Sequence, residues 1–143
     1  MKIAIGGDHA GFLYKKDIIY YLTSKGYEVK DFGTFSEESV DYPDFAHPLA
    51  TAVENNDYQL GILICGSGNG VNITANKHKG IRSGLAWRKE VAALIREHND
   101  ANIMALPARF ISLDTAIECV DAFLNAKFEG GKHERRVQKI HSC

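Results

Sequence analysis

The sequence predicts an α/β protein in which helices cover both faces of a parallel five-stranded sheet. Short apolar segments rich in branched residues alternate with stretches whose apolar residues recur every three or four positions. Such alternation is typical of right-handed βαβ units. The length of 143 residues suits a single domain over residues 1–143, because domains of this size can bury a sizeable core.

Five segments are predicted as strands, at residues 2–6, 27–32, 59–65, 81–87 and 102–106. They are short and rich in β-branched residues, as strands buried on both faces are. We expect the flavodoxin-like strand order 2-1-3-4-5, which places a ligand crevice where the first and third strands leave the sheet. The loops at those exits are the most polar and glycine-rich of the chain, so the order predicts a site between them.

Four helices are predicted between or after these strands, from apolar residues at helical spacing. The first apolar positions of the four stretches are Leu13, Phe45, Val91 and Leu113. Gly26 supplies a stop for the first helix, and Ser112 is the expected N-cap of the last long one. Pro43 and Pro48 are tolerable only near the first turn of the second helix. A short basic helix is expected after the glycines at 130 and 131.

The charges nearly cancel, with 17 Lys and Arg against 18 Asp and Glu. This balance argues against a nucleic-acid or anionic-membrane partner held by bulk positive charge. Residues 31–76 contain seven acidic residues and no Lys or Arg, whereas residues 77–109 contain seven basic and three acidic ones. An anionic ligand must therefore be held by groups from separate segments.

The remaining composition favours a cytoplasmic protein. The N-terminal apolar run is too short for a signal peptide, and the longest apolar run, 60–65, is far too short to span a membrane. The cysteines Cys65, Cys119 and Cys143 are odd in number and form no CxxC pair, so neither a disulfide framework nor a zinc site is indicated.

Residues 65–70, CGSGNG, form the most distinctive loop. Three glycines allow tight turns that direct backbone N–H groups inward ahead of a helix, which favours anion binding. The loop is not a P-loop, because it has no GxxxxGK[ST] pattern. It is not the dinucleotide fingerprint either, because its third glycine falls one position early and Val71 stands where that fingerprint needs Gly or Ala. A merely permissive strand–helix turn is the alternative.

Other chemistry-bearing residues allow two interpretations each. Cys65 is either an inert buried thiol or a thiolate that acts as nucleophile or base beside backbone amides. His98 is either a core histidine or an acid/base group at a helix C-terminus, and Asp8 is either a ligand contact or an N-cap. The basic run 132–136 is either a solvated face or a phosphate clamp. Metal-ligand spacing is absent among the remaining histidines, which we expect to be structural or exposed: His47, His78, His133 and His141.

Four motifs together resemble ribose-5-phosphate isomerase type B, of the family that includes galactose- and allose-6-phosphate isomerases: GGDHAG, ICGSGNGVNITANK, REHNDANI and FEGGKHERRVQKI. The resemblance implies a Rossmann-like α/β/α sandwich with a C-terminal helix and no metal or organic cofactor. It implies interconversion of ribose 5-phosphate and ribulose 5-phosphate in the pentose phosphate pathway. It also implies a homodimer or dimer of dimers whose active sites combine residues of two subunits.

The resemblance also implies roles for individual residues. Cys65 matches the proton-transferring base, Ser67 a hydroxyl position that is commonly Thr, and His98 the acid that opens the sugar ring. Lys132 occupies a position that is often Arg, and it keeps the charge without the bidentate geometry. The implied substrate-binding residues are Asp8, His9, Tyr42, Gly66, Gly68, Asn69, Gly70, Asn99, Arg109, Lys132 and Arg136. A hexose-6-phosphate isomerase of the same family and a non-catalytic sugar-phosphate-binding module are the alternatives.

Overall fold

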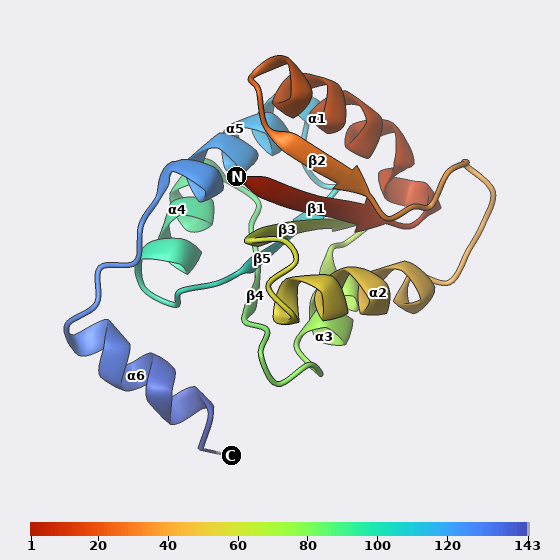
Figure 1. Cartoon of the computed structure of the whole chain (residues 1–143). Coiled ribbons are helices and arrows are strands. Elements are labelled where there is room, and N and C mark those ends of the chain that lie inside the picture. Colours follow the sequence, from red (N-terminus) through yellow and green to blue (C-terminus); the bar gives the residue numbers. More distant parts are fainter. Residues whose placement is uncertain (143) are drawn as a thin grey trace.

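The computed structural model describes residues 1–142 and contains one sheet of five strands, all paired in parallel. The strands lie in the order β2-β1-β3-β5-β4 (Figure 1). Their bounds are β1 (Lys2–Gly7), β2 (Glu28–Asp31), β3 (Leu60–Cys65), β4 (Ser83–Leu85) and β5 (Ile103–Pro107). The expected parallel five-stranded sheet is confirmed.

The expected order is wrong for the last two strands, because β5 lies between β3 and β4. All five residues of β5 are buried, so this strand is suited to the interior of the sheet. The strand β4 has only three residues, all half-buried, and is shorter than the predicted segment 81–87. A short strand is suited to an edge, where it offers few unpaired backbone groups.

The helices cover both faces of the sheet, which confirms the Rossmann-like α/β/α arrangement. Helices α1, α4 and α5 pack on one face and α2 and α3 on the other (Figure 1). Alternate strand residues face opposite layers, so Ile3 and Ile5 join one core cluster and Ala4 the other. The bounds are η1 (His9–Gly11), α1 (Phe12–Ser24), α2 (Pro43–Glu54), α3 (Asn69–Ala75), α4 (Lys89–Glu97), α5 (Leu113–Asn125) and α6 (Lys132–Ile140).

The capping and stop residues of the helices lie where the sequence predicts, whereas one proline does not. The Ser112 side chain caps α5 by accepting from the amide of Thr115 at 3.1 Å, and Gly26 follows α1 with a φ of 92°. Pro48 departs from the expectation, because α2 begins at Pro43 and so places Pro48 in its second turn. The helix forgoes one backbone hydrogen bond there, while its buried face, including Leu49, still packs on the sheet.

The C-terminal helix α6 extends away from the rest of the molecule after Gly130 and Gly131 (Figure 1). Only Val137 among its residues is buried. Within the described residues, no helix combines the length and apolar character needed to cross a membrane.

A buried lysine ties α1 to the segment that follows β2. Lys15 is 1% exposed, and its Nζ donates to Asp31 Oδ1 and to the carbonyl of Thr34, both at 2.6 Å. The amide of Thr34 donates in turn to the carbonyl of Gly7 at 2.8 Å. Lys15 therefore holds the chain after β2 against the end of β1.

We expect Lys15→Met to lower the free energy of unfolding by about 2–3 kcal/mol. Removal of one partner of a fully buried ion pair costs about 3–5 kcal/mol, and the partial exposure of Asp31 reduces that cost. Urea unfolding measures the change. The matched control is Lys16→Met at the exposed neighbouring position, for which we expect a change within about 0.5 kcal/mol. Equal effects of the two variants would contradict the role of Lys15.

Candidate active site

The ends of β1 and β3 approach unusually closely, and this contact sets the position of two loops. A Cβ atom built at Gly7 would lie 2.0 Å from the carbonyl oxygen of Ile64, so only glycine fits. The amide of Asp8 donates to the same carbonyl at 3.2 Å. The loop after β1 consequently lies against the loop that begins at Cys65, as the sequence predicts.

The loop between β3 and α3 turns sharply at Gly68, the N-cap of α3, which has a φ of 76°. The amide of Asn69 donates to Ser67 Oγ at 3.2 Å. The amides in the first turn of a helix have no partner within that helix, so the end of α3 near Cys65 carries N–H groups suited to a negatively charged oxygen. Cys65 itself is 5% exposed and belongs to the core cluster on the α2–α3 face.

A pocket of about 480 Å³ lies where these loops meet. Sequence reasoning missed two of its residues, Ala10 and Phe110. Phe110 directly follows the candidate Arg109 and is 76% exposed, and only this adjacency could have indicated it. The pocket is lined by Asp8, His9, Ala10, Tyr42, Cys65, Gly66, Ser67, Gly70, Arg109 and Phe110. The structure thus brings together eight of the candidate residues from four separate segments.

Arg109 reaches the pocket because β5 is the direct neighbour of β3. The amide of Ala108 donates to the carbonyl of Cys65 at 2.9 Å, and that of Arg109 donates to the carbonyl of Gly66 at 3.0 Å. A Cβ atom at Gly66 would lie 3.2 Å from two atoms of the Arg109 side chain. The guanidinium group is therefore packed over the glycine loop, where it can meet an anion.

Asp8 and His9 both have defined hydrogen-bond partners. Asp8 Oδ1 accepts from the amide of Ala10 at 3.0 Å, so its N-cap role is confirmed. His9 Nδ1 accepts from the amide of Val40 at 3.2 Å, which leaves the proton of the neutral ring on Nε2. Sequence reasoning missed Val40, because a backbone donor carries no residue-type signal.

Tyr42 closes one side of the pocket. It precedes α2, and its ring lies so near Gly70 that a Cβ atom there would come within 2.6 Å of it. Gly68 and Asn69 belong to the same loop, but neither lines the pocket.

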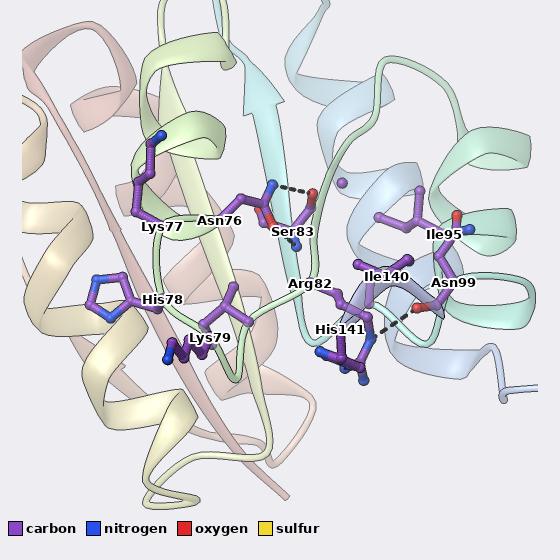
Figure 2. A pocket seen from close by; sticks show the side chains of 13 residues that line it. Asn76, Lys77, His78, Lys79, Arg82, Ser83, Ile95, Asn99, Ile140 and His141 are labelled. Atoms are coloured by element: carbon purple, nitrogen blue, oxygen red, sulfur yellow. Dashed lines mark hydrogen bonds between the residues drawn. The ribbon is translucent and has the colours of Figure 1, made fainter. Parts of the chain in front are cut away.

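Besides Gly68 and Asn69, four further candidate residues lie outside this pocket. Lys132 and Arg136 are exposed on α6, and His98 ends α4. Asn99 lines a separate hollow of about 680 Å³ between the segment 76–84, the end of α4 and α6. Figure 2 shows Asn99 there beside Arg82, whose Nε donates to the Asn99 carbonyl at 3.1 Å.

His98 forms a cluster with residues that follow α5. Its Nε2 lies 3.8 Å from Glu129 Oε1, and His133 Nε2 lies 3.5 Å from the same oxygen. The two imidazole rings stack at a centroid distance of 4.1 Å and an interplanar angle of 10°. Burial lowers the pKa of His133, and the neighbouring His98 lowers it further. With 39% of its side chain exposed, His98 is not a core histidine.

Known proteins are similar to this chain in both sequence and fold. Ribose-5-phosphate isomerase B of Escherichia coli strain K12 is 46% identical over 139 residues, which cover 97% of this chain and 93% of that protein. The structure of ribose-5-phosphate isomerase B from Clostridium thermocellum superposes with a TM-score of 0.98 at 50% identity and covers 99% of this chain and 96% of its own.

A third comparison includes a bound sugar phosphate. The crystal structure of ribose-5-phosphate isomerase B from Mycoplasma genitalium with bound ribulose-5-phosphate has a TM-score of 0.94 at 45% identity, covering 99% of this chain and 94% of that one. The profile of the Ribose/Galactose Isomerase family matches residues 3–140. With its glycine loop, cysteine and arginine gathered at one sheet edge, the chain belongs to the ribose/galactose isomerase family.

Proposed function

We propose that this protein is an aldose–ketose isomerase that interconverts ribose 5-phosphate and ribulose 5-phosphate without a cofactor. The observation that carries the proposal is the pocket that combines a thiol, a glycine-rich amide loop and an arginine. Isomerisation needs one base and stabilisation of one oxyanion, while the phosphate needs a cation. The relatives named ribose-5-phosphate isomerase B support this choice of substrate.

Cys65 is the proposed base. As a thiolate it takes the proton from C2 of the open-chain aldose phosphate, and the electron pair forms an enediolate across C1 and C2. The same proton returns to C1, while the proton of the C2 hydroxyl moves to the C1 oxygen, which leaves a hydroxyl at C1 and a ketone at C2. No net oxidant or reductant is consumed. A positioned base of this kind contributes about 10²–10⁴-fold in rate.

The enediolate oxygen is stabilised by the backbone amides of the loop from Gly66 to Gly70. One preorganised donor of this type contributes about 2.7–4 kcal/mol in measured enzymes. The donors belong to the backbone and to a segment without Lys or Arg, so this segment itself contributes dipoles and no positive charge. Ser67 supplies a hydroxyl that relays protons between the two oxygens.

The phosphate is bound by the charged and N–H donors that line the pocket. Arg109 provides a charged, bidentate donor, and His9 donates from Nε2 because its Nδ1 is occupied by the Val40 amide. Asp8 and Tyr42 contact the sugar. Binding energy from the remote phosphate then orients C1 and C2 against Cys65.

A second copy of the chain completes each pocket in our proposal. His98, Asn99, Lys132 and Arg136 all lie outside the pocket of their own chain, and α6 projects from the molecule (Figure 1). Exposed apolar residues, Ile140 on α6 and Trp87 beside β4, are suited to an interface between copies. In the homodimer, His98 opens the sugar ring in the partner's pocket. A free thiol as base suits a reducing compartment, the cytoplasm.

We expect Cys65→Ala to lower kcat by about 10²–10⁴-fold, because the proton at C2 loses its base. Steady-state turnover of ribose 5-phosphate and a circular dichroism spectrum measure activity and fold separately. The control is Cys119→Ala, which removes a fully buried thiol of pKa about 11, raised by burial, in α5; it should keep its turnover. Near-normal turnover by Cys65→Ala would refute the assignment of the base.

A complementation experiment tests the shared site. Cys65→Ala and His98→Asn homodimers should each be inactive, whereas a mixed dimer contains one pocket with both native residues. After unfolding and refolding in equal amounts, about a quarter of the wild-type activity should return, because half of the dimers are mixed and each has one active pocket. If Cys65 and His98 act within one chain, mixing restores nothing.

Substrate length is the third test. With one end of the substrate held at Arg109 and the other at Cys65, an added carbon displaces one of them, so kcat/KM for allose 6-phosphate and galactose 6-phosphate should be about 10–200-fold lower than for ribose 5-phosphate. Faster turnover of a hexose phosphate would favour the hexose-6-phosphate isomerase. Binding of all three without turnover would favour a non-catalytic module.

A further inference from the structure

The base of α6 carries a group of side chains that the proposed reaction does not use as a unit. His98, Glu129 and His133 each offer one ligand atom, and these atoms lie within 4.8 Å of one another. They come from the end of α4, the segment after α5 and the first turn of α6. Across the part of the chain that the structure describes, no other set of three His, Cys, Asp or Glu meets this criterion.

The spacing of these atoms is close to that of a zinc site. Zinc–nitrogen and zinc–oxygen bonds of 2.0–2.2 Å in a tetrahedron put neighbouring ligand atoms about 3.4 Å apart. The distances from Glu129 Oε1 to the two histidine nitrogens are 3.5 and 3.8 Å. The rings are nearly parallel, so each must rotate about its Cβ–Cγ bond to direct its lone pair at a shared ion. That torsion has broad, shallow minima.

We propose that His98, Glu129 and His133 bind a divalent transition-metal ion of the zinc type, with the fourth position open to water. Two histidines and one glutamate are a ligand set that proteins use for zinc with one open position. The sequence predicted no metal site, and His133 was expected to be merely structural or exposed. The sequence shows no local metal-binding motif here, because His98 and Glu129 are 31 positions apart.

The surroundings restrict which ions can bind. Lys132 and Arg136 carry positive charge on the same helix as His133, so attraction by net charge is weak. The affinity must come from bonds to imidazole nitrogen, which favours Zn²⁺, Ni²⁺ and Cu²⁺. Mg²⁺ and Ca²⁺ prefer oxygen ligands and should not bind.

A bound ion would have two consequences. The Glu129 amide already donates to the Glu97 carbonyl at 3.0 Å and so links the end of α4 to the segment after α5. The ion would add His133 to this contact and so fix α6 relative to α4. It would also occupy His98 Nε2. This second consequence rests on the proposed function: if His98 opens the sugar ring, the bound metal inhibits ring opening.

Isothermal titration of the full-length protein with ZnCl₂ alone tests the site without reference to activity. We expect one Zn²⁺ per chain, no heat with MgCl₂, and at least tenfold weaker Zn²⁺ binding by His133→Ala and by Glu129→Gln. Even loss of an outer-shell partner of a metal ligand costs about 10–100-fold in affinity. Unchanged affinity in both variants would overturn the proposal.

The chain offers a matched control in a second pair of histidines with a glutamate. His47 Nδ1 and His78 Nε2 are hydrogen-bonded at 2.8 Å, and His78 Nδ1 faces Glu54 at 3.5 Å. The two imidazoles thus direct their nitrogens at each other rather than at a shared point. The double variant His47→Ala/His78→Ala should bind Zn²⁺ as the wild type does, and so should Cys65→Ala. Loss of binding in either control, with retention in His133→Ala, would place the ion elsewhere.

Turnover of ribose 5-phosphate provides the second arm. Saturating Zn²⁺ should inhibit the wild type, and Glu129→Gln should need at least tenfold more Zn²⁺ for the same inhibition. Equal sensitivity of the two proteins would overturn the inhibitory role. If the wild-type protein shows no isomerase activity, only the proposed function is refuted, because the titration still decides whether the metal binds.

Discussion

The backbone contact between the ends of β1 and β3 is the constraint on which the candidate site depends. At Gly7 there is no room for a side chain, because the carbonyl of Ile64 fills that space. The loop after β1 and the loop that begins at Cys65 are consequently neighbours. Two glycines therefore have different roles here. Gly7 allows β1 and β3 to approach closely, and Gly68 adopts the positive φ with which the chain turns into α3.

The distribution of charge matches this geometry. The thiol and the amide loop come from the stretch of residues 31–76, which contains seven acidic residues and no Lys or Arg. A cation must come from another segment of the chain. Arg109 provides it, because this residue follows β5, the strand that pairs with β3. The separation suits a substrate whose phosphate needs a cation and whose reacting carbons need dipoles.

Much of the fold could be predicted because it depends on local pattern. The alternation of strands and helices, the Ser112 cap and the Gly26 stop all follow from residues close in sequence. The meeting of two glycine-rich loops also follows, because parallel strands end at one edge of a sheet. The positions of β4 and β5 could not be predicted, since both are short apolar segments. Burial of β5 on both faces, which is a property of the packed sheet, decides between them.

The sequence by itself determined the α/β class, the glycine loop and Cys65 as its first residue, because each depends on residues that are close together in the chain. Tertiary structure alone decided that Arg109 lies over Gly66, that the Val40 amide selects the tautomer of His9, and that His98 meets Glu129 and His133. These contacts join segments 31 or more residues apart. The periodicity of apolar residues predicts which face of a helix or strand is buried. Only the packing of the whole chain determines which residues that face, and the ends of the element, contact.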